Sequence, residues 1–363
     1  MSALRDMIAA NGPVWLAVGG LAVGMAFGAI VFATNFCTMG AISDIVTLGD
    51  WRRLRAWLLA AATALLGTQL LHGAGAVDLA ASMYLSPTLN WTGHIAGGAM
   101  FGFGMVFAGG CPSRNLARVG GGDLRALMVL LVLGIFAYMA MGGLLGPLRA
   151  ALEQATSVTL ATPTQGVGDI LAVTSGMPAG RGTLAASAVL IGAVLVYCFK
   201  DVGFRSSRVH VWSGVGIGLC AVAGWALTGL AFDEMSDRPT PPISLTYVRP
   251  TADAIEWLEK YTAARLPGFG VATVFGAILG AFLVAVAKGR TRVGSFADTR
   301  DTLRSLMGAA LMGIGGVMAL GCTIGQGITG VSTLALGSFL TFAAIVAGGV
   351  AGVKTLERWL MAE

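Results

Sequence analysis

Nine stretches of this sequence are apolar for long enough to cross a lipid bilayer. A transmembrane helix needs about 20 apolar residues to span roughly 30 Å of hydrocarbon. Windows bounded by charges or by Pro, Gly and Asn clusters lie at about 14–34, 54–72, 93–109, 124–146, 184–200, 211–231, 268–287, 306–321 and 334–353. With 56% hydrophobic and only 11% charged residues, the composition excludes the soluble enzyme classes. The sequence therefore predicts an all-α integral membrane protein, with residues 1–363 forming a single polytopic domain.

The basic residues are divided unequally between alternate loops. Sixteen of the 23 Lys and Arg residues fall in one set of loops, and seven, including Arg5 and Arg238, fall in the other. Cytoplasmic loops are enriched in these cations, so we expect a periplasmic N-terminus and a cytoplasmic C-terminus. No Lys/Arg block resembles a nucleic-acid-binding patch, so nucleic acid is not an expected partner.

Two outer loops are long, at 148–182 and 232–267. In the second, residues 252–266 are amphipathic: Ile255, Leu258 and Tyr261 lie opposite Asp253, Glu256 and Glu259. This pattern predicts a helix lying on the rim of the membrane, and a plain extracytoplasmic linker is the alternative.

An internal repeat becomes visible when Cys111 is aligned with Cys322, an offset of 211 residues. Six positions then match, namely Gly102/Gly313, Gly104/Gly315, Val106/Val317, Ala108/Ala319, Gly110/Gly321 and Cys111/Cys322. An odd number of predicted spans separates the two copies, so they should enter the membrane from opposite sides. We expect two inverted halves, 1–182 and 183–363. Inverted halves that are interrupted near the same point are typical of a transport site at the membrane midplane, which favours a transporter or channel.

Three cysteines follow apolar helices and precede glycine and polar residues, in segments 35–45, 109–122 and 321–330. Glycine can end a helix at low steric cost, and the polar side chains then offer hydrogen bonds at a depth where lipid-exposed loops do not occur. We expect short broken or re-entrant segments here. The predicted substrate-binding residues are Cys37, Gly110, Cys111, Arg114, Asn115, Gly321, Cys322, Thr323 and Gln326. The other two cysteines, Cys198 and Cys220, lie inside plain spans and are expected only to pack.

Three thiols along one path suit a soft, sulfur-bearing anion that is handed from one S–H donor to the next. A pore for soft metal cations is the competitor, but the methionines lack a repeated ligand spacing. No two cysteines are closer than 22 positions, so we expect neither a metal site nor a disulfide framework, and no cofactor.

A rival of another class is a membrane-embedded sulfurtransferase that carries sulfur as a cysteine persulfide. Such chemistry needs a positioned base, and His72, His94 and His210 all lie in other segments. Beside Cys111, Arg114 and Arg118 are open to two interpretations, as attractors of an anion or as basic anchors at the cytoplasmic face. The acidic residues Asp44 and Asp123 are expected to cap helices, and His72 and His94 only to pack or to lie at the interface.

At its cysteine segments the chain resembles the YeeE/YedE family of bacterial inner-membrane sulfur transporters. The residues that carry the resemblance are Phe36-Cys37-Thr38-Met39-Gly40, Gly109-Gly110-Cys111 and Gly321-Cys322-Thr323-Ile324-Gly325-Gln326-Gly327. The resemblance implies an hourglass of inverted helical halves, a relay of the three cysteines, and thiosulfate as substrate. It also implies a small cytoplasmic sulfurtransferase of the TusA or rhodanese type as partner, while one branch of the family is linked to selenium. After Cys111 the sequence departs from the small residues associated with thiosulfate importers, because 112–118 is bulkier and more basic.

Overall fold

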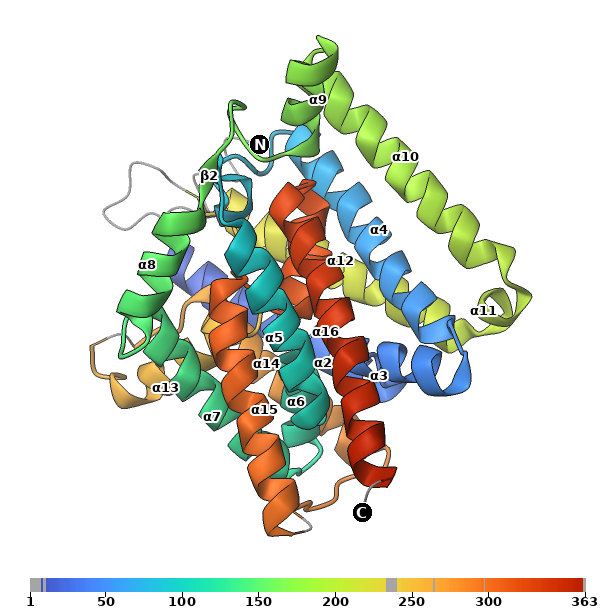
Figure 1. The fold of residues 1–363 in the computed structure, drawn as a ribbon, viewed down its shortest axis with the longest axis vertical. Helices are drawn as coiled ribbons and strands as arrows, with labels where there is room; N and C mark the ends of the chain where they lie inside the picture. The colour runs from blue at the N-terminus through green and yellow to red at the C-terminus, as the bar shows by residue number, and fades with distance from the viewer. Residues whose placement is uncertain (1–7, 9–10, 233–239, 264, 297, 362–363) are drawn as a thin grey trace.

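A computed structural model describes residues 8, 11–232, 240–263, 265–296 and 298–361; Arg5 and Arg238 lie outside them. The helices are α2 Gly12–Thr34, α3 Thr38–Ser43, η1 Asp44–Leu48, α4 Arg52–Gly73, η2 Met83–Leu85, η3 Gly93–Gly97, α5 Gly98–Phe107, α6 Pro112–Gly120, α7 Leu124–Met141, α8 Gly146–Thr156, α9 Val167–Ser175, α10 Ala179–Lys200, α11 Val202–Ser206, α12 Arg208–Leu230, α13 Arg249–Glu259, α14 Phe269–Ala287, α15 Thr299–Met318, η4 Gly325–Gly330, η5 Val331–Thr333 and α16 Leu336–Met361 (Figure 1). Two short strands, β1 Thr88–Leu89 and β2 Val158–Thr159, pair antiparallel.

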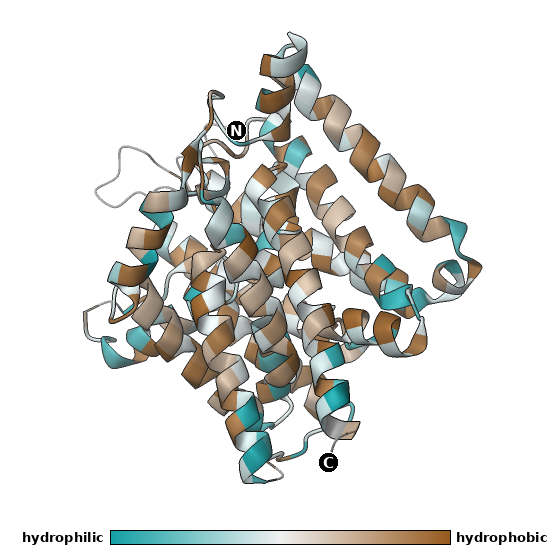
Figure 2. Ribbon diagram, in the orientation of Figure 1, coloured by the Kyte–Doolittle hydropathy of each residue, from teal (hydrophilic) through white to brown (hydrophobic). Residues whose placement is uncertain are grey.

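Eight helical stretches in the described part of the chain are long and apolar enough to cross a membrane. They are Gly12–Leu48, Arg52–Gly73, Gly93–Gly120, Leu124–Met141, Ala179–Lys200, Arg208–Leu230, Phe269–Ala287 and Leu336–Trp359. The long helices consist mainly of apolar residues, and hydrophilic residues gather at their ends (Figure 2). The protein is thus an all-α, multi-pass membrane protein, as predicted. The expected ninth span lies in α15, which falls outside this set because its first turns carry Arg300, Asp301 and Arg304.

The two helices that carry the aligned glycines, α5 and α15, pack against each other in antiparallel directions. A Cβ placed on Gly104 would lie 2.6 Å from the Gly308 carbonyl oxygen, and one on Gly315 would lie 2.6 Å from the Gly97 carbonyl oxygen. The repeat relates these two contacts to each other. With the offset of 211, Gly104 corresponds to Gly315 and Gly308 corresponds to Gly97, so each contact is the repeat counterpart of the other. Small residues let the two backbones approach this closely, and such contacts hold helices together in lipid.

A second glycine seam joins α2 to α14. Three glycines at four-residue spacing, Gly20, Gly24 and Gly28, face successive turns of α14, and Gly276 and Gly280 face back toward α2. Neither helix has room for a side chain at these positions, so the two axes run in close contact. The periphery is different: only 17% of the apolar window of α10 is buried, and Figure 1 shows this helix along one edge of the molecule.

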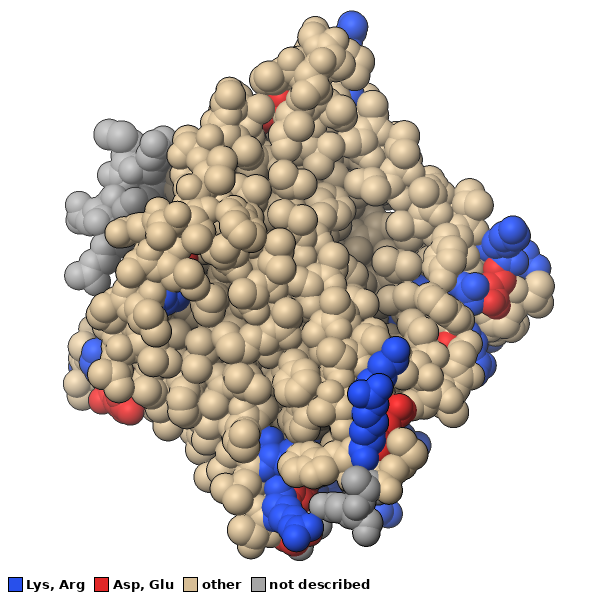
Figure 3. Space-filling model, in the orientation of Figure 1, with Lys and Arg blue, Asp and Glu red and all other residues tan. Residues whose placement is uncertain are grey.

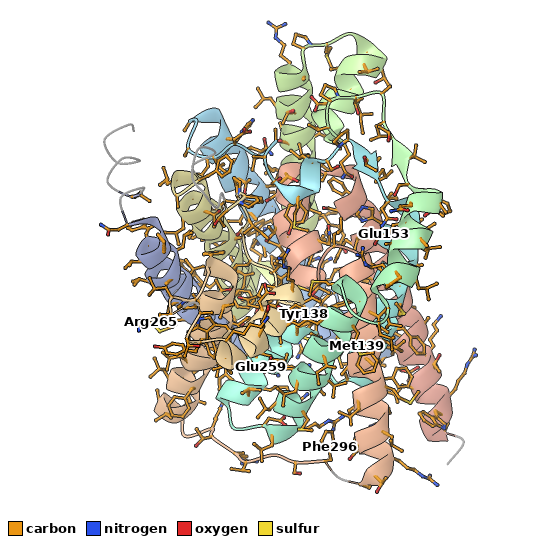
Figure 4. All side chains as sticks on the ribbon, turned by 90° about the vertical axis from the view of Figure 1, so that its left-hand side faces the viewer. Tyr138, Met139, Glu153, Glu259, Arg265 and Phe296 are labelled. Carbon is orange, nitrogen blue, oxygen red and sulfur yellow. The ribbon has the colours of Figure 1, made fainter. Side chains whose placement is uncertain are left out.

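The amphipathic stretch of the second long loop does form a helix, α13, but it begins and ends earlier than predicted. The Tyr138 hydroxyl on α7 lies within hydrogen-bond distance of two of its carboxylates, Asp253 at 2.7 Å and Glu256. Leu258, Glu259 and Tyr261 are exposed. Figure 4 shows Tyr138 on α7 near this helix. The predicted helix is therefore confirmed, and a tyrosine on a neighbouring span offers its carboxylates hydrogen bonds that the loop sequence does not reveal.

The residues just before α13 form a buried segment without regular secondary structure. Ser244, Leu245 and Tyr247 are each at most 2% exposed. Backbone groups at such depth need partners, and side chains supply them: Thr228 bonds both the N–H and the carbonyl of Ile243, and Thr329 donates to the Leu245 carbonyl at 2.7 Å. The loop expected to lie wholly outside the membrane therefore dips into the protein.

Charged residues gather at the ends of the molecule, and the face seen in Figure 3 has a broad uncharged belt between them. At the foot of α15, Arg125 pairs with Asp301 at 2.8 Å, and Arg304 reaches the same carboxylate at 2.7 Å. Figure 4 places Phe296 at this end of α15, and the Arg125 guanidinium lies 5.8 Å from its ring centre. The Arg55 guanidinium pairs with Asp201 beside α11. These ion pairs stand where charged residues belong in a membrane protein, beyond the apolar belt.

Candidate functional site

The two aligned helices end in the same way. The N–H of Gly110 bonds the Met105 carbonyl at 2.8 Å, and the N–H of Gly321 bonds the Gly316 carbonyl at 2.8 Å. Both glycines have positive φ, 147° and 157°, where a side chain would be strained. Each break therefore delivers the following cysteine, Cys111 or Cys322, at the start of a new helical turn.

The structure brings the three predicted cysteines together. Cys37 and Cys322 both lie close enough to Cys111 for their thiols to influence it electrostatically. Cys111 also contacts the Ser113 hydroxyl at 3.1 Å. In contrast, Cys198 donates to the Arg55 carbonyl at 3.3 Å, away from this group. The five cysteines are all free thiols.

The site is closed. Cys111 and Cys322 are 1% and 0% exposed, whereas Cys37 is only partly buried. A separate cavity of about 230 Å³ lies between the end of α4, residues 79–85 and the first long loop, and it reaches Thr333 and Leu334 at the end of η5. The thiols thus form a constriction rather than the wall of an open channel.

The two predicted amide side chains occupy corresponding positions, since Gln326 stands 211 residues after Asn115. Asn115 Nδ2 donates to the Gly110 carbonyl at 2.8 Å, and Gln326 Nε2 donates to the Ala319 carbonyl at 2.7 Å. Gln326 Oε1 also accepts from Ser338 at 2.7 Å. Both amides are held by the protein and stabilise the turns that present Cys111 and Cys322.

The two arginines beside Cys111 differ in their partners. Arg118 pairs with Asp123 at 2.6 Å and donates to the Gly109 carbonyl at 3.1 Å. Arg114 instead donates to Asn35 at 2.9 Å and exerts its charge on Cys37, and no carboxylate partner for it is found in the described chain. Arg118 therefore holds the fold together, while Arg114 leaves positive charge at the thiols.

Of the two predicted acidic caps, only one is a cap. Asp123 accepts the Ala126 N–H at 3.2 Å at the start of α7. Asp44 lies at the junction of α3 and η1 and pairs with Arg53 at 3.2 Å instead. The prediction failed because the helix continues through Asp44 as a π-helical turn, so no free helix start exists there for the carboxylate to cap.

Sequence reasoning missed three polar groups in this region. Thr38, Trp57 and Tyr247 are each at most 2% exposed, and the Thr38 Oγ1, Trp57 Nε1 and Tyr247 hydroxyl have no hydrogen-bond partner in the described structure. Thr323, which was predicted, is 0% exposed and also unpartnered. A sequence signal existed for Thr38, because Cys-Thr-x-Gly occurs at both Cys37 and Cys322. Nothing in the sequence marks Tyr247, which arrives from the buried loop.

The histidines bond other groups: His94 contacts the Thr341 hydroxyl at 2.7 Å, His72 the Val77 carbonyl at 3.0 Å and His210 the Ser207 hydroxyl at 2.6 Å. Within the described residues, no cluster of three or more His, Cys, Asp or Glu side chains could hold a metal ion. The chemistry at the constriction is therefore that of thiols, hydroxyls and one arginine.

Broken helices that meet at a buried polar point inside a helical membrane protein define a transporter. The chain belongs to the sulphur transport family, whose model matches residues 33–351, including all three cysteines of the constriction. It is similar to the thiosulfate transporter TsuA of Escherichia coli strain K12, with 27% identity over 331 residues that cover 86% of each chain. It is also similar to the thiosulfate transporter TsuA of Spirochaeta thermophila, with 28% identity over 323 residues, 86% of this chain and 90% of the relative.

Proposed function

We propose that this protein imports thiosulfate across the bacterial inner membrane through the constriction formed by Cys37, Cys111 and Cys322. The observation that carries the proposal is that these three thiols lie close enough to influence one another, two of them fully buried, and that Arg114 bonds Asn35 two residues before Cys37. The terminal sulfur of thiosulfate is soft and negatively charged, and an S–H group can donate to it without binding it tightly. Neutral thiols in series then let the anion move from one donor to the next, and no covalent bond forms.

The proposal includes two inverted halves, 1–182 and 183–363, with Cys322 approached from the periplasm and Cys111 from the cytoplasm. Gly110, Asn115, Gly321 and Gln326 shape the turns that present the thiols. Because the site is closed, passage requires these turns to move. On the cytoplasmic side, a small sulfurtransferase of the TusA or rhodanese type receives the sulfur.

Uptake of radiolabelled thiosulfate by cells that express the protein tests the function, with sulfate as the comparison solute. We expect thiosulfate uptake alone, and we expect Cys37→Ala, Cys111→Ala and Cys322→Ala each to lower it at least about tenfold, the cost of one donor to an anion. The matched controls Cys198→Ala and Cys220→Ala should keep uptake, since both thiols lie in plain helices.

Absent uptake, or equal uptake of both solutes, would contradict the proposal. Competition by sulfite or by a selenium oxyanion would identify a different soft anion as the substrate. A persulfide trapped on Cys111 after exposure to thiosulfate, with release of sulfite, would instead identify a sulfurtransferase.

A further inference from the structure

Two of the three cysteines begin the same local structure. Cys37-Thr38-Met39-Gly40 and Cys322-Thr323-Ile324-Gly325 share the pattern Cys-Thr-x-Gly. In both, the cysteine sulfur accepts the N–H of the glycine three residues later, at 3.4 Å. A π-helical turn follows in each case, at Asp44–Leu48 and at Gly325–Gly330. One threonine therefore stands directly after each thiol in the same setting.

The hydroxyls of these two threonines are buried and unpartnered. Thr38 is 2% exposed and Thr323 is 0% exposed, and neither Oγ1 has a hydrogen-bond partner in the described structure. Two buried threonines that follow Thr323 are satisfied, because Thr329 donates to the Leu245 carbonyl at 2.7 Å and Thr333 donates to the Gly330 carbonyl at 2.8 Å. A buried hydroxyl is costly to leave unpaired, so two of them at equivalent places indicate a ligand.

The position of Thr323 fits such a ligand. It follows Cys322 in the chain, and its side chain lies near the Cys111 thiol without forming a hydrogen bond to it. Its hydroxyl is therefore placed to donate a hydrogen bond to an anion that passes between these two thiols.

We propose that the Thr38 and Thr323 hydroxyls bind the oxygen atoms of the substrate while the thiols bind its sulfur, an inference that rests on the proposed function. Thiosulfate has one soft terminal sulfur and three hard oxygens, and a hydroxyl is a stronger hydrogen-bond donor to oxygen than a thiol is. Two kinds of donor along the path would select an anion that carries both kinds of atom. Sulfate lacks the soft end, and a simple sulfide lacks the oxygens.

The test measures KM and kcat for radiolabelled thiosulfate with the purified full chain in liposomes. Thr38→Val and Thr323→Val keep the shape of the side chain but remove the donor, and each should raise KM about tenfold or more. Thr323→Ser restores the donor and should return KM to within about twofold of the parent value. The control Thr273→Val should leave KM unchanged, because that hydroxyl bonds the Gly270 carbonyl of its own helix at 2.6 Å.

An unchanged KM in both valine variants, while the parent chain transports thiosulfate, would overturn this inference and leave the proposed function standing. A Thr323→Ser variant as impaired as Thr323→Val would also overturn it, because packing rather than donation would then explain the loss. Absence of uptake by the parent chain would overturn both. If Thr323→Val fails to elute as a folded protein, Thr323→Ala replaces it and must show the same raised KM.

Discussion

Individual residues at the constriction divide into those that hold the turns and those that remain free to act. Asn115 and Gln326 donate their amide N–H groups to backbone carbonyls, and Arg118 forms an ion pair with Asp123. The three thiols, Arg114 and the hydroxyls of Thr38 and Thr323 do not donate to backbone carbonyls or pair with carboxylates in the described structure. This division was not visible in the sequence, where Arg114 and Arg118 are two similar residues one helical turn apart.

The contrast between the two arginines leads to a paired prediction. Arg114→Gln should lower thiosulfate uptake several-fold, because it removes the charge that draws the anion, and should leave the unfolding temperature unchanged. Arg118→Gln should destabilise the protein by roughly 1–2 kcal/mol, because Asp123 and the Gly109 carbonyl lose a partly buried charged donor. Thermal unfolding in detergent and uptake per amount of folded protein check the pair. Equal destabilisation by both substitutions would contradict the distinction.

At the scale of secondary structure, the site depends on helices that stop inside the protein. Gly93–Gly120 counts as one apolar span, yet it is interrupted between α5 and α6, where Gly110 turns the chain. The packing of α5 on α15 fixes the position of each break, because the close glycine contacts prevent one helix from shifting along the other. These contacts therefore set the relative positions of the turns that carry Cys111 and Cys322.

The close packing of α5 on α15 predicts the effect of adding a side chain at one of its glycines. Gly104→Leu should destabilise the protein by roughly 1–3 kcal/mol and reduce uptake, since even a Cβ at this position would lie 2.6 Å from the Gly308 carbonyl oxygen. The matched control is Gly192→Ala in α10, where nothing lies within 4 Å. That change should be neutral or stabilise by about 0.5–1 kcal/mol, because alanine favours the helix. Detergent melting curves measure both, and a larger loss for Gly192→Ala would refute the packing argument.

For the whole molecule, the relative directions of helices decide the number of crossings. α15 runs antiparallel to α5, and α16 runs parallel to α5, since Gly98 and Gly102 face Thr341 and Ile345 in the same order. The chain therefore reverses direction between α15 and α16, although α15 begins with charged residues. The hydropathy of α15 as a whole, including its charged first turns, leaves this helix out, whereas its direction relative to its neighbours argues for counting it as the ninth span that the sequence predicts.

We accordingly predict that the two termini lie on opposite sides of the membrane. A fluorescent protein fused to the C-terminus should fluoresce, because Lys354 and Arg358 precede it and basic ends remain in the cytoplasm. The same reporter fused to the N-terminus should be dark, and alkaline phosphatase fused there should be active. Fluorescence from both fusions would mean that the chain crosses an even number of times.

The sequence by itself determined the membrane class, most spans, the three cysteine segments and the family resemblance, because apolar length and Gly-Cys patterns are local properties. It also placed the helix breaks, since glycine at a helix end has a local steric reason. Only the tertiary structure decided that Cys37 lies near Cys111, that Tyr247 is buried although it lies in a loop, and that Asp253 and Glu256 face Tyr138. Those facts depend on which distant groups become neighbours, and the satisfaction of a buried polar group is settled by those neighbours rather than by the residue's place in the chain.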